Sequence, residues 1–319
     1  MIAISKDIAL AVKILKNDQL IGFPTETVYG LAGNIFSKKA IRSIFKIKKR
    51  PKFNPLIVHI SKIEDLKTIA SEIPENAKKL ANAFWPGPLT LLLKKHESVS
   101  DLITAGKDTV AVRIPNHPLA LAILDALDFP LAAPSANPFG SISPTTAQHV
   151  ADYFREQIEA VFDGGSCDNG IESTIVGFEN EKIIIYRLGA ISIEAIETIV
   201  GKTERYINNN IDPEAPGMLS KHYAPKTKFI LTASIENEIL KYYNQKIGIL
   251  SFNKNYDLAG IQSVEILSKS SDFREASKNL YAAMHRLDNL NLDVIIAAIL
   301  PDYDLGKSVN DRLKRAASR

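Results

Sequence analysis

A run of polar groups directly after a short apolar stretch gives the clearest chemical signal of the chain. Residues 22–31 read GFPTETVYGL, so hydroxyl, carboxyl and phenol groups follow a strand that we expect at 20–23. Open α/β sheets bind ligands where their strands end, so this cluster could hold a small polar molecule. The structural alternative is that the proline and glycine mark a turn and that Thr25 caps a helix.

A compact cationic cluster, Lys48, Lys49 and Arg50, follows this polar stretch about twenty residues later. On an intact helix Lys48 and Arg50 would point about 200° apart. Because Pro51 disfavours helix at Arg50, an extended end would let the loop direct both side chains to one ligand. Arg50 suits two-pronged phosphate binding, and Lys48 suits a mobile charge on a carboxylate or phosphate. The structural alternative is the basic last turn of an amphipathic helix.

Arg113 and His59 stand near the ends of two apolar runs that we expect to form strands. A buried arginine requires an anionic partner, which is either a protein carboxylate or the carboxylate of a ligand. Glu26 and Asp163 are candidate partners for cations or for backbone amides. A lone histidine on a strand is more often a hydrogen-bonded core residue than a catalyst.

The sequence excludes several other kinds of site. It has neither G-x-x-x-x-G-K-S/T nor G-x-G-x-x-G, so cationic side chains and hydroxyls would have to bind a nucleotide. One cysteine, Cys167, excludes an internal disulfide, and the histidines show no metal-ligand spacing. The net charge is only +3, so any electrostatic role must come from local clusters. No stretch approaches the roughly twenty apolar residues of a membrane span, and a cytoplasmic location is expected.

Two bodies joined by a loop must position these groups. Apolar runs predict strands at 20–23, 56–60, 89–93, 110–114, 131–133, 174–176 and 183–186, and helical spacing predicts helices at 8–15, 41–47, 77–84 and 119–127. Periodicity disappears between 202 and 226, where Asn, Pro and Gly accumulate. Beyond it, strands at 229–231, 247–252, 264–267 and 294–300 alternate with helices at 235–243, 273–290 and 309–317. This alternation favours a small parallel sheet.

The motifs resemble those of the YrdC-like family of threonylcarbamoyl-AMP synthases. PTETVYGL at 24–31 is similar to its first signature, and the K-x-R and S-x-N elements stand as KKR at 48–50 and SAN at 135–137. The match continues through WPGPLT at 85–90, DTVAVR at 108–113, ESTI at 172–175 and RLG at 187–189. APGM at 215–218 and KHYAP at 221–225 resemble the linker of the two-domain branch.

The resemblance implies an α/β (α+β) fold with an open twisted mixed sheet and a small Rossmann-like parallel domain. The expected division is a catalytic domain at 1–201, a linker at 202–226 that closes over the active site, and a C-terminal domain at 227–319. Residues matching the family's L-threonine site are Thr27, His59, Arg113, Ala133 and Ser173. Residues matching its ATP site are Arg50, Asn54, Thr109, Ser135, Ser143, Arg187 and Tyr223. Lys48 and Arg50 would serve catalysis, with Arg113 on the threonine carboxylate and Ala133 leaving room for its methyl group.

The implied reaction is an ATP-dependent condensation of L-threonine with bicarbonate or CO₂, which gives threonylcarbamoyl-AMP and pyrophosphate. ATP would be a substrate, with Mg²⁺ beside it and no metal on the protein. The product would pass to a transferase complex that modifies tRNA beside the anticodon. An RNA-binding module without catalysis is the alternative, because eight basic residues crowd 38–52. A hydrogenase-maturation factor, which resembles this domain, carries zinc-binding segments that one cysteine cannot supply.

Overall fold

The structure, a computed structural model, describes residues 2–180, 182–206, 213–218, 222–242, 244–258 and 260–318. The chain forms two compact units. The first comprises Met1–Phe139, Pro144–Asp168 and Glu172–Leu219, and the second comprises Gly140–Ser143, Asn169–Ile171 and Ser220–Arg319. The boundary near 219 falls inside the segment that we expected to be a linker.

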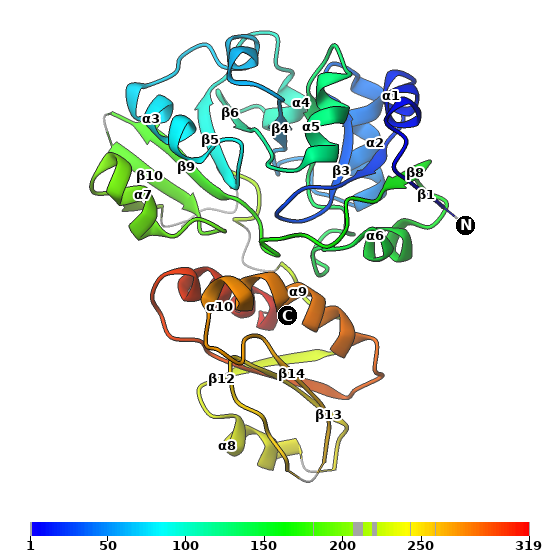
Figure 1. Cartoon of the computed structure of the whole chain (residues 1–319), viewed down its shortest axis with the longest axis vertical. Coiled ribbons are helices and arrows are strands. Elements are labelled where there is room, and N and C mark those ends of the chain that lie inside the picture. Colours follow the sequence, from blue (N-terminus) through cyan, green and yellow to red (C-terminus); the bar gives the residue numbers. More distant parts are fainter. Residues whose placement is uncertain are drawn as a thin grey trace. The chain divides into compact units, whose positions relative to one another are not determined.

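The described part of the first unit is built on an eleven-stranded mixed sheet in the order β1-β8-β2-β3-β7-β4-β6-β5-β9-β10-β11 (Figure 1). The sheet contains both parallel and antiparallel pairs, since β6 pairs parallel with β4 and antiparallel with β5. This confirms the predicted mixed sheet. The strands are β1 Ala3–Ser5, β2 Ile21–Phe23, β3 Gly30–Asn34, β4 Ile57–His59, β5 Leu89–Lys94, β6 Thr109–Arg113, β7 Leu131–Ala132, β8 Ala160–Phe162, β9 Thr174–Glu179, β10 Lys182–Arg187 and β11 Glu204–Arg205.

Helices cover this sheet because their apolar side chains recur at helical spacing. In α2, Ser37 caps the amide of Ala40, and the buried stripe includes Ile41 and Ile44. The helix stops at Lys48 because Lys49 adopts a left-handed conformation with φ of 52°. The helices are α1 Ile8–Lys16, α2 Lys38–Lys48, η1 Ile63–Thr68, α3 Glu75–Phe84, α4 Asp101–Thr104, α5 Pro118–Asp125, α6 Ala147–Phe154 and α7 Ile193–Val200.

The alternation of side chains along β4 and β6 sorts the central residues onto two faces. Val58 and Val112 join the large core that α2 and α3 cover. Ile57 and Ala111 belong to a different cluster, which also contains Ala215 and Met218. His59 and Arg113 are two residues further along the same strands, so they share the face of Ile57 and Ala111. This face carries the polar residues of interest.

Part of the expected linker packs on the first unit. Glu204 and Arg205 form β11, which pairs parallel with β10. Ala215 is fully buried and Met218 is 6% exposed, both within the cluster on the sheet face that carries Arg113. Residues 207–212 and 219–221 of the expected linker lie outside the described residues.

The second unit contains a four-stranded parallel sheet in the order β12-β15-β13-β14. Helices α9 and α10 lie on one face of this sheet and α8 lies on the other (Figure 1). The predicted small parallel domain is therefore confirmed. Across the described residues, no helix is long and apolar enough to cross a membrane. The elements are β12 Lys228–Thr232, α8 Ile235–Ile239, η2 Leu240–Tyr242, β13 Ile247–Ser251, β14 Ile261–Ile266, α9 Phe273–Asp288, β15 Val294–Ala298 and α10 Leu305–Ala317.

Candidate functional site

The polar stretch after β2 forms a closed loop rather than the start of a helix. The hydroxyl of Thr25 donates to the carbonyl of Val28 at 2.7 Å and accepts from the amide of Thr27 at 3.2 Å. The phenol of Tyr29 donates to the carbonyl of Gly165 at 2.7 Å, which ties the end of the loop to the segment after β8. The alternative of a helix N-cap at Thr25 is therefore wrong, because the hydroxyl is used within its own turn.

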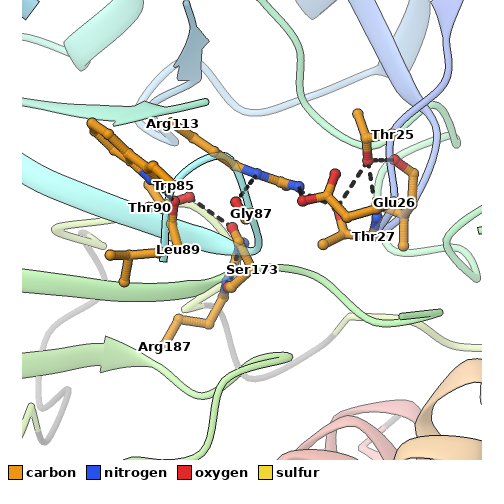
Figure 2. Close-up of polar contacts among 11 residues, drawn as sticks. Thr25, Glu26, Thr27, Trp85, Gly87, Leu89, Thr90, Arg113, Ser173 and Arg187 are labelled. Carbon is orange, nitrogen blue, oxygen red and sulfur yellow. Dashed lines mark hydrogen bonds and ion pairs between the residues drawn. The ribbon is translucent and has the colours of Figure 1, made fainter. Parts of the chain in front are cut away.

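Arg113, the last residue of β6, is the centre of a buried polar cluster (Figure 2). Its Nη1 donates to Oγ1 of Thr27 at 2.8 Å, and its Nε donates to the carbonyl of Gly87 at 3.2 Å. Its Nη2 lies 2.5 Å from Oε1 of Glu26, and both side chains are almost completely buried. Glu26 is therefore a protein carboxylate of the kind that the sequence left open as a partner of Arg113, and a ligand carboxylate at Arg113 stays a prediction.

The contact between Arg113 and Glu26 is an ion pair without an aligned hydrogen bond. Among the described residues, no donor meets the geometry of a hydrogen bond to either carboxylate oxygen of Glu26, although both oxygens are buried. Nη2 of Arg113 likewise makes no hydrogen bond of suitable geometry to a described residue. A buried carboxylate normally receives two or more hydrogen bonds, so this pair holds unused bonding capacity.

His59 lies beside Arg113 in the sheet, and Ala133, which follows β7, lies on the other side of β4. His59 is the register partner of Arg113 across the parallel pair of β4 and β6. Burial, reinforced by the positive charge of Arg113, lowers the pKa of His59 to about 3, so its ring is neutral at physiological pH. The amide of Ala133 donates to the carbonyl of Ile57 at 3.1 Å, which places Ala133 at the start of β4.

A second cluster on the same sheet joins Ser173 and Arg187 (Figure 2). The hydroxyl of Ser173 lies 2.7 Å from that of Thr90, and Nη2 of Arg187 contacts both the hydroxyl and the carbonyl of Ser173, at 3.0 and 2.8 Å. Nη1 of Arg187 donates to the carbonyl of Pro216 at 3.1 Å. The segment at 213–218 therefore contributes a polar contact to this cluster as well as apolar packing.

Lys48 is fixed rather than mobile, which corrects the sequence-based expectation. Its ammonium donates to the carbonyls of Ser135 and Asn137, each at 2.5 Å, and the side chain is 1% exposed. Burial and the neighbouring charge of Arg50 hold the pKa of Lys48 well below its usual value. This contact joins the K-x-R and S-x-N motifs in space.

Arg50 leaves the helix before Pro51, as expected, but its guanidinium is engaged by its own loop. It donates to the carbonyl and side-chain oxygen of Asn54, at 3.1 and 2.6 Å, and to the carbonyl of Pro55 at 2.7 Å. Thr109 begins β6, and its buried hydroxyl has no hydrogen-bond partner among the described residues.

Two of the expected site residues belong to the second unit. Nε2 of His285 donates to the carbonyl of Ser143 at 3.2 Å. Tyr223 is buried, with its ring centroid 5.6 Å from that of Tyr281 and 5.0 Å from the guanidinium carbon of Arg312. The other expected residues lie in the first unit.

Of the basic residues at 38–52, Lys48 and Arg50 are buried and several others line a surface groove. An open groove of about 920 Å³ runs along α2 and α4. Three of its basic lining residues, Lys38, Arg42 and Lys46, come from α2, and Phe53 lines it with 43% of its surface exposed. Throughout the part of the chain that the structure describes, no group of three or more His, Cys, Asp or Glu residues could hold a metal ion.

The structure adds contacts that the sequence alone did not single out. These are the ion pair of Glu26, the carbonyl of Gly87, the hydroxyl of Thr90 and the carbonyl of Pro216. The backbone carbonyls carry no sequence signal. Glu26 and Thr90 lie within the recognised motifs, so their positions were visible but their partners were not.

Comparisons with known proteins agree over the whole chain. The Sua5/YciO/YrdC family profile, described as Telomere recombination, matches residues 13–189, and the profile described as Threonylcarbamoyl-AMP synthase, C-terminal domain, matches residues 191–318. A threonylcarbamoyl-AMP synthase of Pyrococcus abyssi is 39% identical over 97% of this chain and 94% of its own length. One of Bacillus subtilis is 37% identical over 97% of this chain and 92% of its own.

A solved structure is also similar. The crystal structure of P. abyssi Sua5 complexed with L-threonine matches with a TM-score of 0.91 and 37% identity, covering 99% of this chain and 97% of that one. The likeness therefore includes both units.

Proposed function

The chain belongs to the Sua5/YciO/YrdC family, and from this premise we propose how its residues perform the reaction. It is an enzyme, a nucleotidyltransferase that makes L-threonylcarbamoyl-AMP for the threonylcarbamoyladenosine modification of tRNA. The observation that carries this conclusion is the match over 97% of the chain to relatives that are threonylcarbamoyl-AMP synthases. L-threonine and ATP are its substrates, and we propose bicarbonate or CO₂ as the source of the carbamoyl carbon.

We assign the amino acid to the buried polar cluster around Arg113. The resemblance assigns L-threonine to Thr27, His59, Arg113, Ala133 and Ser173. Arg113 supports this proposal because its guanidinium is buried, charged and carries an Nη2 without an aligned hydrogen bond. A planar guanidinium recognises a carboxylate better than a point charge does. The neutral ring of His59, beside it in the sheet, adds a hydrogen-bonding group without adding charge.

We assign the nucleotide to the cationic cluster that contains Lys48 and Arg50. From the resemblance we propose that Arg50, Asn54, Thr109, Ser135 and Arg187 bind ATP, and Ser143 and Tyr223 stay predicted ATP-site residues. In the first unit, Lys48 holds the carbonyl of Ser135, and Arg50 holds Asn54. These contacts set the positions of the proposed phosphate-binding groups before the ligand arrives. Preorganised charges of this kind stabilise the charge that develops during phosphoryl transfer.

The reaction requires no nucleophile from the enzyme. The threonine amine attacks CO₂, and an oxygen of the resulting carbamate attacks the α-phosphate of ATP, displacing pyrophosphate. Lys48 and Arg50 would stabilise the charge on the phosphates, and positioning would contribute the rest. Mg²⁺ would supply further charge neutralisation on the phosphates. The cationic and hydroxyl groups described here suit phosphates rather than a metal, so we assign Mg²⁺ no protein ligand.

Further steps follow from the same proposal. The product would pass to a tRNA threonylcarbamoyl transferase complex in the cytoplasm, and residues 202–226 would cover the nucleotide. Weak RNA contact at the basic groove along α2 stays a prediction. The alternative of an RNA-binding module without catalysis is not favoured, because the relatives that match the whole chain are synthases.

The test is product formation by the purified protein. Threonylcarbamoyl-AMP, detected by mass spectrometry, and pyrophosphate should appear only when ATP, L-threonine and bicarbonate are all present. Pyrophosphate release that ignores threonine, or binding of RNA without product, would contradict the proposed function.

A further inference from the structure

Glu26 is a buried carboxylate that forms an ion pair with Arg113 but whose hydrogen-bonding capacity is not used. Its side chain is 6% exposed, and both oxygens lack a hydrogen-bond donor among the described residues. Its neighbours differ, because Thr25 and Thr27 each make hydrogen bonds within the loop or to Arg113. Leaving a buried acceptor without a hydrogen bond is unfavourable, even where an ion pair balances its charge. A carboxylate kept in this state at a binding site indicates a donor that arrives with the ligand.

The geometry of the substrate identifies that donor. In an α-amino acid the carboxylate and the ammonium group share one carbon atom. If Arg113 binds the carboxylate, as in the proposed function on which this inference rests, the ammonium group comes within a few ångströms of the partner of Arg113. That partner is Glu26, whose carboxylate faces the guanidinium (Figure 2). An ammonium offers three N–H donors, which suits two unpaired carboxylate oxygens.

We propose that Glu26 is the proton acceptor that converts the bound threonine ammonium into the nucleophilic amine. One N–H bond breaks and its proton passes to a carboxylate oxygen of Glu26. The freed lone pair forms the N–C bond to CO₂, and one C=O electron pair moves to oxygen. The adduct loses its second N–H proton to solvent and becomes the carbamate. Glu26 returns its own proton to solvent at the end of the cycle.

Three other titratable side chains, those of His59, Cys167 and Lys48, are not anionic. His59 on β4 is neutral, but burial and Arg113 lower its pKa to about 3, so it holds a proton weakly. Cys167, in the loop after β8, lies within electrostatic reach of Glu26, and burial raises the pKa of its thiol, which keeps it protonated. Lys48 already donates to two carbonyls. Glu26 is the anionic group among them.

The pH dependence of the rate distinguishes a proton acceptor from a residue that only orients Arg113. Glu26→Gln keeps the size of the side chain and removes its basicity. Turnover is measured as threonylcarbamoyl-AMP formation with the full chain, saturating ATP and constant dissolved CO₂. Glu197→Gln is the matched control, because that carboxylate binds the amide and hydroxyl of Thr203 outside the proposed site.

We expect Glu26→Gln to lower kcat by about a hundredfold to ten-thousandfold near neutral pH. Its rate should then rise about tenfold per pH unit, because only threonine that is already deprotonated can react, while the wild type and Glu197→Gln change little. A uniform loss at every pH, or wild-type activity of Glu26→Gln, would overturn the proposal. Absence of product from the wild-type protein would instead overturn the proposed function.

Glu26→Asp keeps the test decisive if Glu26→Gln does not fold. It retains a carboxylate one methylene further back, so its rate should be lower than that of the wild type with the same shallow pH profile. A rise of about tenfold per pH unit in Glu26→Asp would contradict the role of the carboxylate.

Discussion

Replacing Arg113 by methionine should destabilise the first unit strongly. The guanidinium is buried in an ion pair with Glu26 and also donates to Thr27 and to the carbonyl of Gly87. Removing one partner of a buried pair leaves the other charge unpaired, which costs about 3 to 5 kcal/mol. The expected fall in the free energy of unfolding lies in this range. It far exceeds the effect of most surface substitutions.

The single tryptophan provides a local probe. Trp85 is buried in the first unit and its indole donates to the carbonyl of Leu89 at 2.7 Å. Its fluorescence during urea unfolding therefore reports on this unit rather than on the second one. The double variant Arg113→Met with Glu26→Met should be more stable than Arg113→Met alone, because no unpaired charge remains. A loss below about 1 kcal/mol in Arg113→Met, or strict additivity in the double variant, would refute this reasoning.

Three further predictions test the packing, the electrostatics and the substrate pocket. Met218→Ala should lower the free energy of unfolding by about 2 to 4 kcal/mol in the same assay, because it leaves a cavity in the apolar cluster that contains Ala215. A loss near zero would show that the segment at 213–218 does not pack tightly on the first unit. The folded-state pKa of His59 is about 3 against an ordinary value of 6.5, so its contribution to stability is present at higher pH and is lost as pH falls through this window. Between about pH 7 and about pH 5, the free energy of unfolding of the wild type should fall by about 2 kcal/mol more than that of His59→Gln. If urea titrations give the same pH dependence of this free energy for both proteins, the pKa of His59 is contradicted. Serine should be a poor but real substrate, since one missing methyl is worth about 1 to 3 kcal/mol of binding, and valine should be worse because it lacks the hydroxyl. If ATP releases as much pyrophosphate with valine as with threonine, the enzyme does not recognise the hydroxyl.

The strongly apolar elements of the fold could be predicted from the sequence. Runs of β-branched and aliphatic residues predicted β4, β5, β6 and β10, and the mixed sheet with a small parallel sheet after it is confirmed. The strand β3, which reads GLAGN, was not predicted, because its glycines have no strand propensity. It forms because β2 and β7 pair with it on both sides. Tertiary pairing, not local preference, decides such a segment.

The sequence named a set of candidate site residues, which stays a prediction, but it did not predict their contacts. The resemblance assigned Thr27, Arg113 and Ser173 to one predicted site. Nothing local indicates that Arg113 meets Glu26 or that Lys48 meets the carbonyl of Ser135. Lys48 and Ser135 are separated by 87 positions, and Arg113 and Thr27 by 86. Contacts over such separations depend on sheet order. The expectation of a mobile Lys48 was wrong because its burial could not be read from a helix end.

Calorimetric titration of two variants with each substrate tests the central claim most directly, that separate groups bind the amino acid and the nucleotide. Arg113→Ala should weaken L-threonine binding by about 2 to 4 kcal/mol and leave ATP binding nearly unchanged. Arg50→Ala should do the reverse. Equal weakening of both ligands in both variants, or unchanged threonine binding in Arg113→Ala, would contradict the assignment of the two sites.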